Sequence, residues 1–356
     1  MASVEPPKAK EELEDAEREK KLLEWTLTKC NAGTTIDFTE GWEIIEKNGL
    51  RVLSDMLRKF LLNRNNSASR DRAPFGKKGM SSLYTTSYMM VNCNSTNASK
   101  ADPAREFYDR ISDFMKQHLD SKDIRDVVDN ETRNMSLKEF ISIWQSYKIM
   151  TKWICYLFNH LEGGVIKLNE LMTLTSVALV SFYEVVYKKF STQQTILTLS
   201  CILREREGEL IDIELMQESL QIYSMMGVAT KITGAMANDL REKLSNIDRA
   251  LKLQEFRQIY DTDFEKDFLK ETKDFYFRKS CEWIANSSVD TYVSLIDDVL
   301  AKEEKRLLAY LNPSTKPKLM RVCLEECVYA HKSALFESLK EMLRGIYDNT
   351  QVCFLY

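Results

Sequence analysis

The chain is poor in the residues that interrupt helices. Its 356 residues include only 11 glycines and 6 prolines, while hydrophobic residues make up 44% and charged residues 29%. Long helices with little punctuation are expected from such a composition. We therefore predict an all-α fold, long enough for two domains or for one extended array of repeats.

Positive charge is not in excess. The 50 basic residues are outnumbered by 54 acidic ones, which gives a net charge of −4. A nucleic-acid-binding protein needs a basic excess to neutralise phosphates. We expect no nucleic-acid partner.

Long hydrophobic runs and paired cysteines are also missing. The best apolar run, from Val177 to Val186, is short and contains Ser181 and Glu184, and the N-terminus is charged. The eight cysteines form no CxxC pair, and a chain of this size needs no disulfides to fold. We expect no signal peptide, no membrane span, and reduced thiols in the cytoplasm, the nucleus or both.

No motif for catalysis or phosphate binding is evident. His118 and His160 have no Ser, Cys or acidic partner at a recognisable spacing. Gly163 and Gly164 lack the further glycines and the Lys-Ser/Thr pair of a phosphate loop. We predict that the chain is not an enzyme and uses no cofactor.

Two patterns could supply metal ligands, and both fall short. Asp297-Asp298 and Glu303-Glu304 lack a further carboxylate one turn after the Asp pair, so a solvated helix face is the default interpretation. Cys323, Cys327 and His331 share a helix face but have no fourth ligand, which is more typical of a partly buried stripe. We predict no metal site.

Apolar residues recur at helical spacing along most of the chain. Residues 1–33 form a mixed-charge lead with a thin apolar stripe, which we expect to be loosely held. A long amphipathic helix follows from Ile36 to Phe60, with Asp37 and Thr39 available as caps. Further helices are predicted over 107–119, 137–161 with Gly163-Gly164 as its end, 168–190, 192–206 ended by Gly208, 213–226 ended by Gly227, 241–255, 256–277, 292–311 and 317–343.

The segment from Leu83 to Met90 is rich in Tyr and Met and almost free of charge. In a helix, Met80, Tyr84, Ser87 and Tyr88 would lie on adjacent turns of one side. Ordinary helix packing is one interpretation of this side. A docking face for another protein is the other, because Tyr and Met are enriched at interfaces.

Four segments decide between these interpretations. They are Leu83-Tyr84-Thr85 with Tyr88, Trp144 to Lys148, Leu203 to Ile211, and Tyr260 to Leu311 with its Phe275-Tyr276 and Glu303-Glu304 motifs. In this order, from about Ile36 to about Ser338, they resemble the N-terminal half of a cullin, the scaffold of multi-subunit ubiquitin ligases. The resemblance is greatest to the cullin that serves F-box receptors.

The resemblance implies an elongated stalk of stacked five-helix cullin repeats, two complete and the third truncated. The implied parts are a lead over 1–33, a first repeat over 34–164, a second over 165–286 with an insertion near 229–253, and a partial third over 287–356. The C-terminal half of a cullin, which holds the RING subunit and the lysine that accepts a ubiquitin-like modifier, has no counterpart. We expect no recruitment of a RING subunit.

The resemblance also implies partners. In such a cullin the second and fifth helices of the first repeat bind a Skp-type adaptor and touch the F-box protein beside it, within an SCF-like ligase of ubiquitin-dependent protein catabolism. Carried over by position, the surface consists of Met80, Ser81, Leu83, Tyr84, Ser87 and Tyr88 on one helix and Lys148, Lys152, Tyr156, Asn159 and His160 on the other.

Several of these residues are smaller than the anchors expected. Met80, Ser81 and Ser87 replace larger or aromatic groups, and His160 stands where Tyr is expected, so we predict weaker binding than in a full family member. The alternative is a helical-rod tethering or trafficking subunit unrelated to ubiquitin, since any stacked-helix rod has this composition and periodicity.

Overall fold

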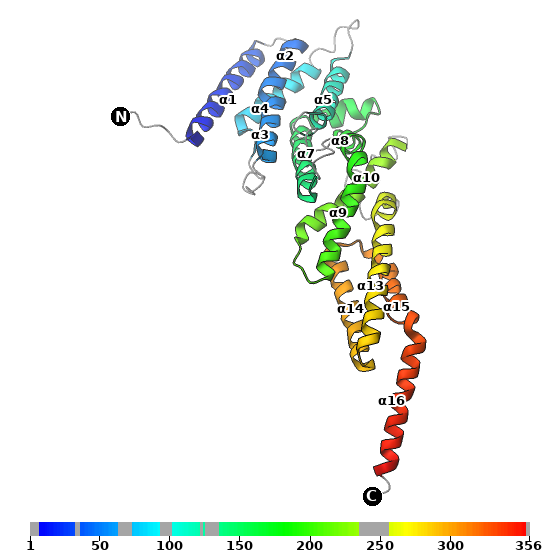
Figure 1. Cartoon of the computed structure of the whole chain (residues 1–356). Coiled ribbons are helices and arrows are strands. Elements are labelled where there is room, and N and C mark those ends of the chain that lie inside the picture. Colours follow the sequence, from blue (N-terminus) through cyan, green and yellow to red (C-terminus); the bar gives the residue numbers. More distant parts are fainter. Residues whose placement is uncertain are drawn as a thin grey trace, which may run out of the picture. The chain divides into compact units, whose positions relative to one another are not determined.

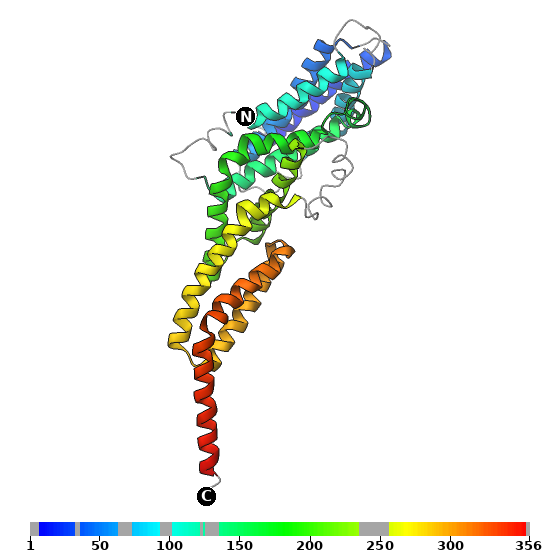
Figure 2. The same ribbon diagram turned by 90° about the vertical axis from the view of Figure 1, so that its right-hand side faces the viewer.

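The computed structural model of the chain describes residues 7–32, 36–62, 73–92, 102–121, 124, 135–234 and 256–353. Every regular element in this part of the chain is a helix (Figures 1 and 2). The all-α prediction is confirmed. Among the described helices, we find none whose length and hydropathy would let it span a bilayer.

The chain forms two compact units. Unit 1 comprises residues 1–190 and 228–252, and unit 2 comprises residues 191–227 and 253–356. These bounds differ from the predicted repeats, because α8 (Leu174–Phe182), assigned to the second repeat, packs against α5 (Pro103–Leu119) and α7 (Leu137–Leu157) of the first. Repeats defined by helix count need not coincide with compact units, so the predicted repeat boundaries stay a prediction.

Unit 1 is built around α4 (Lys77–Asn92), which contacts α1, α2, α5 and α7. The predicted long helix over 36–60 is observed as a continuous run that begins after Asp37, whose carboxylate caps it by accepting from the backbone N–H groups of Thr39 and Glu40. The remaining elements of the unit are α1 (Pro7–Asn31), α2 (Phe38–Ile45), η1 (Glu46–Leu50), α3 (Arg51–Leu62), η3 (Glu162–Ile166) and η4 (Tyr183–Tyr187).

The N-terminal lead is more firmly packed than the sequence indicated. Its helix α1 lies against α4 (Figure 1), with Leu22 and Thr26 buried in the contact. The Thr26 and Thr86 hydroxyl oxygens are 3.5 Å apart, and Glu19 accepts a hydrogen bond from the backbone N–H of Gly76. The apolar stripe is thin because only one narrow face of α1 meets the unit.

The end of α7 differs from the prediction. The helix stops at Leu157, where the backbone N–H of Phe158 closes the last turn on the carbonyl of Ile154. Gly163 and Gly164 lie further on, inside η3, with no left-handed φ. They are therefore not the glycines that end this helix.

Unit 2 contains the greater part of α9 (Lys188–Arg206) and of α10 (Ile213–Gly234), together with a group of three helices, α13, α14 and α15, that contact one another (Figure 1). Its remaining bounds are η6 (Tyr260–Glu265), α13 (Lys266–Asn286), α14 (Val289–Tyr310), η7 (Pro313–Thr315), α15 (Lys316–Cys327), η8 (Tyr329–His331) and α16 (Lys332–Cys353). Most of the predicted insertion over 229–253 lies outside the described residues, and its first residues continue α10.

Two glycines of unit 2 have different roles. Gly208 follows α9 with φ +98°, so it ends that helix as predicted. Gly227 was predicted to break a helix, but it lies within α10. A Cβ at this position would overlap the carbonyl oxygen of Phe256, so glycine permits a close approach of the two backbones.

A buried charged cluster joins the third and fourth of the resembling segments. Arg206 donates to Glu303 (2.9 Å) and to the Thr272 hydroxyl (2.7 Å), and its guanidinium lies 5.4–5.5 Å from the rings of Phe268, Phe275 and Tyr276. Arg306 pairs with Glu303 as well and donates to Glu205 (2.8 Å). Burial raises the pKa of Glu303, but the two arginines outweigh it and hold that pKa below its ordinary value. These motif residues therefore stabilise the interior of unit 2.

The stripe of Cys323, Cys327 and His331 is part of the same interior. Both thiols are buried, and burial raises the pKa of Cys327 to about 12. His331 Nε2 lies 2.8 Å from the Ser280 hydroxyl. Within the described residues, no three His, Cys, Asp or Glu side chains converge as metal ligands would need to.

Candidate partner-binding surface

Within the part of the chain that the structure describes, one stripe of α4 faces solvent, because α1, α2, α5 and α7 cover its other sides. Ser81, Tyr84, Tyr88 and Asn92 are exposed at intervals of three or four residues, which places them along one line of the helix. Tyr84 is 39% and Tyr88 47% exposed, and their rings stack with centroids 6.2 Å apart. The predicted aromatic patch therefore does reach the surface.

Two of the predicted contact residues do not belong to this stripe. Leu83 and Ser87 are fully buried. Leu83 faces the interior of the unit, and the Ser87 hydroxyl donates back to the carbonyl of Tyr84 (2.9 Å). Their prediction as contact residues needs correction, because they lie on the packed side of α4. Met80 is half-buried at the edge.

A second stripe runs along α7. Lys148, Lys152 and Tyr156 are spaced by four residues, and Asn159 follows in the turn after the helix. Lys152, Tyr156 and Asn159 are exposed, with Tyr156 at 61%, while Lys148 is half-buried with its ammonium 5.6 Å from the Trp144 ring. This stripe presents two positive charges and one exposed aromatic ring.

The two stripes meet at His160. Its ring lies edge-on to Tyr84 (5.3 Å) and Tyr88 (5.9 Å), with Phe107 6.5 Å away. Both of its nitrogens are buried and have no hydrogen-bond partner among the described residues. Desolvation lowers the pKa of His160 to about 4, so the imidazole is neutral at pH 7. Tyr84 and His160, which were both predicted for one surface, therefore lie side by side.

We name Ser81, Tyr84, Tyr88, Lys148, Lys152, Tyr156, Asn159 and His160 the α4–α7 surface. It carries aromatic rings at its α4 side and positive charge along α7. Aromatic anchors with a polar or charged rim are typical of protein-binding surfaces.

The second resembling segment is mostly structural. Trp144 and Tyr147 are buried and pack on Phe182, with ring centroids 4.7 and 5.8 Å away. Of this segment, Lys148 is the residue whose side chain reaches the α4–α7 surface. The motif thus holds α7 against α8, and sequence reasoning could not separate that role from partner binding.

The described residues define a class before any comparison. They form an all-helical protein with an aromatic and basic surface across two neighbouring helices and, within the described ranges, no group of side chains that could hold a metal ion. A helical-repeat protein that binds other proteins fits these properties.

A protein-family model described as the cullin alpha solenoid domain matches residues 59–354. The chain belongs to the cullin family. An alpha solenoid fits the predicted stacking of helical repeats. This match favours the cullin interpretation over the tethering subunit, which rested on composition and periodicity.

Curated relatives agree with this assignment. The chain is 23% identical over 302 residues to cullin-2 of Arabidopsis thaliana, covering 84% of this chain and 35% of that protein. It is 26% identical over 303 residues to cullin-1 of Oryza sativa subsp. japonica, covering 85% and 35%. Cullin-like protein 3 of Arabidopsis thaliana is 26% identical over 186 residues, covering 52% and 63%. The matched region spans about a third of the length of the first two relatives.

Proposed function

We propose that this chain is a scaffold subunit of a cullin-based ubiquitin ligase and that its α4–α7 surface binds a Skp-type adaptor together with an F-box protein. It acts as a scaffold rather than as an enzyme, in ubiquitin-dependent protein catabolism, in the cytoplasm, the nucleus or both. The observation that carries the proposal is the convergence of Tyr84, Tyr88 and His160 from two helices at an exposed face.

Physical chemistry supports this use of the surface. Tyr84 and Tyr88 bring large ring area whose conformation is already restricted by stacking and by the His160 edge, so little rotamer freedom is lost when a partner covers them. Lys148 and Lys152 would attract an acidic adaptor and steer its approach.

The composition of the surface also limits its affinity. Ser81 offers little area for burial, and the two His160 nitrogens are already shielded from solvent without a hydrogen-bond partner among the described residues. We therefore propose that binding is weaker than in a family member that has aromatic anchors at these positions.

Co-expression with a Skp-type adaptor, alone and with an F-box protein, tests the proposal. We expect the proteins to co-elute from a size-exclusion column at a volume smaller than that of any component. Separate elution of folded chain and folded adaptor at micromolar concentrations would contradict it.

A further inference from the structure

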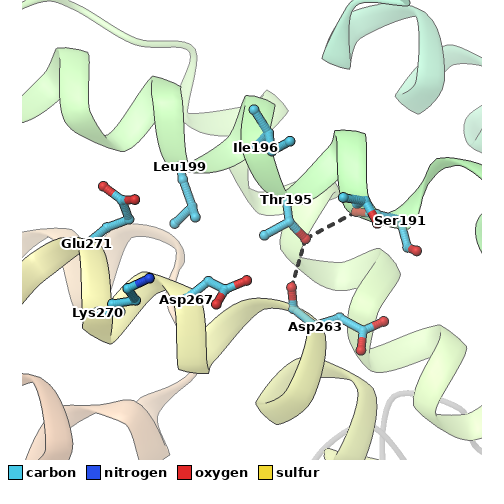
Figure 3. A pocket seen from close by; sticks show the side chains of 9 residues that line it. Ser191, Thr195, Ile196, Leu199, Asp263, Asp267, Lys270 and Glu271 are labelled. Carbon is cyan, nitrogen blue, oxygen red and sulfur yellow. Dashed lines mark hydrogen bonds between the residues drawn. The ribbon is translucent and has the colours of Figure 1, made fainter.

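A hollow of about 470 Å³ lies within unit 2, between α9 and the η6–α13 segment (Figure 3). Its α13 side lies within the fourth resembling segment, Tyr260 to Leu311, and its residues play no part in the proposed adaptor surface. Its lining consists of Ser191, Thr192, Thr195, Ile196 and Leu199 on one side and Asp263, Asp267, Lys270 and Glu271 on the other.

Hydrogen bonds link the two walls of the hollow at one end. The Thr195 hydroxyl donates to the carbonyl oxygen of Asp263 (2.7 Å), and the Tyr223 hydroxyl lies 2.9 Å from the Thr195 hydroxyl oxygen and can donate to it. Thr195 is buried, so this link is protected from water. The hollow is therefore held open between two fixed helices.

The α9 wall is aliphatic. Ile196 is 55% exposed and Leu199 half-buried one turn further along. The Leu199 side chain points into the space between the helices, whereas Ile196 lines the outer rim of the hollow with its side chain directed away from α13 (Figure 3). An aliphatic group placed there would cover them and gain from the removal of apolar surface from water.

The α13 wall is acidic. Asp267 and Glu271 are exposed and one helical turn apart, and neither forms an ion pair with a described residue. Lys270 contributes the single positive charge among the lining side chains, against three carboxylates. These carboxylates do not converge on one point as metal ligands would, since no such group exists among the described residues. The wall suits separated positive charges better than one metal ion.

We propose that this groove binds a basic segment of a partner protein, with an aliphatic side chain against Ile196 and Leu199 and Lys or Arg side chains beside Asp267 and Glu271. The lining spans nine residues on each side, from Ser191 to Leu199 and from Asp263 to Glu271, which is roughly 12 Å of helix and accommodates about two turns of a bound helix. Charge complementarity sets the approach of the segment and the aliphatic contact sets its register. This inference is independent of the adaptor surface.

The probe is a fluorescein-labelled peptide of roughly twelve residues with leucines on one helical face and lysines on the other. Fluorescence anisotropy should show saturable binding to the full chain, and a matched peptide with glutamates in place of the lysines should not bind. The double variant D267N/E271Q should weaken binding about fivefold or more at low salt. Ile196→Ser, at an exposed position that does not endanger folding, should weaken it by a similar factor.

The matched control is D297N/D298N, which removes the same charge from an exposed face of α14. It should change the affinity less than twofold. Three results would overturn the proposal, because each would mean attraction by charge alone. The two double variants could weaken binding equally, or Ile196→Ser could have no effect. Spermine could also displace the labelled peptide as effectively as the unlabelled peptide does. None of these variants should affect co-elution of the chain with the adaptor, so the two proposals are tested separately.

Discussion

His160 makes the stability of unit 1 depend on pH. Its folded-state pKa is lowered to about 4 by desolvation, against an ordinary value of 6.5. Between these values the unfolded chain binds more protons than the folded one, so stability falls as the pH falls from 6.5 toward 4. Above pH 6.5 the imidazole is neutral in both states and contributes no pH dependence.

We therefore expect His160→Phe, which has a similar ring and no titrating nitrogen, to remove part of the acid sensitivity. On going from pH 7.5 to pH 5, the wild-type chain should lose on the order of 1 kcal/mol more unfolding free energy than the variant. Urea titrations followed by circular dichroism at both pH values measure this difference. Identical losses would mean that the imidazole is protonated in the folded state.

Lys152 is predicted to influence how fast an acidic adaptor associates. It is exposed on the α7 stripe. Lys152→Glu should slow association severalfold at low salt and much less at high salt, because solvent-exposed charges act mainly on encounter and are screened by ions. Stopped-flow mixing with labelled adaptor measures the rate. Lys302→Glu, at an exposed position of α14, is the matched control, and an equal effect there would refute a local role.

At the scale of elements, α4 is held in place at its N-terminus by another helix. The Glu19 carboxylate of α1 accepts from the backbone N–H of Gly76, one residue before α4 begins. A carboxylate at a helix N-terminus satisfies an orphan donor and complements the helix dipole.

Glu19→Ala should therefore lower stability by about 1 kcal/mol and speed amide hydrogen exchange in the first turn of α4. Mass spectrometry of the exchanged protein locates the change. Glu24→Ala, an exposed position on the same helix, should leave exchange in α4 as it is. Unchanged exchange in Glu19→Ala would show that α4 is anchored by its apolar contacts alone.

The Glu303 cluster makes a sharper prediction. Glu303 is fully buried between Arg206 and Arg306, so Glu303→Gln leaves two buried guanidinium groups without their shared counter-charge. The loss of unfolding free energy should be about 3 kcal/mol or more. Glu304→Gln changes the neighbouring residue, which pairs with Lys316 at the surface, and should cost less than about 1 kcal/mol. Similar losses in chemical denaturation would refute the proposed importance of the cluster.

The helices of this chain could be predicted from the sequence, but the faces that they bury could not. Helical periodicity predicted nearly every described helix, and the tyrosine segment indicated a surface. The pattern could not fix which side of α4 is covered, because Leu83 and Ser87 are buried by helices that come from distant parts of the chain. Gly227 was misread for a similar reason, since the close approach of Phe256 leaves no trace in local sequence.

At the scale of the whole molecule, family membership accounts for the helical architecture but does not show which motif residues bind a partner. The family match covers residues 59–354 and accounts for the helical repeats. The resembling motifs that support it divide by role: the Leu83-Tyr84 segment reaches the surface, whereas the segments around Arg206 and Glu303 stabilise the interior of unit 2. The groove between α9 and α13 was missed altogether, because no motif pairs Ile196 with Asp267 and Glu271.

The most direct measurement is the dissociation constant of a Skp-type adaptor by titration calorimetry, for the wild-type chain, Tyr84→Ala and Tyr329→Ala. Tyr329 is 62% exposed in unit 2 and provides the matched loss of an exposed ring. We predict that Tyr84→Ala raises the dissociation constant about tenfold or more, while Tyr329→Ala leaves it within about twofold. Adaptor affinity unchanged by Tyr84→Ala in a folded chain would contradict the account.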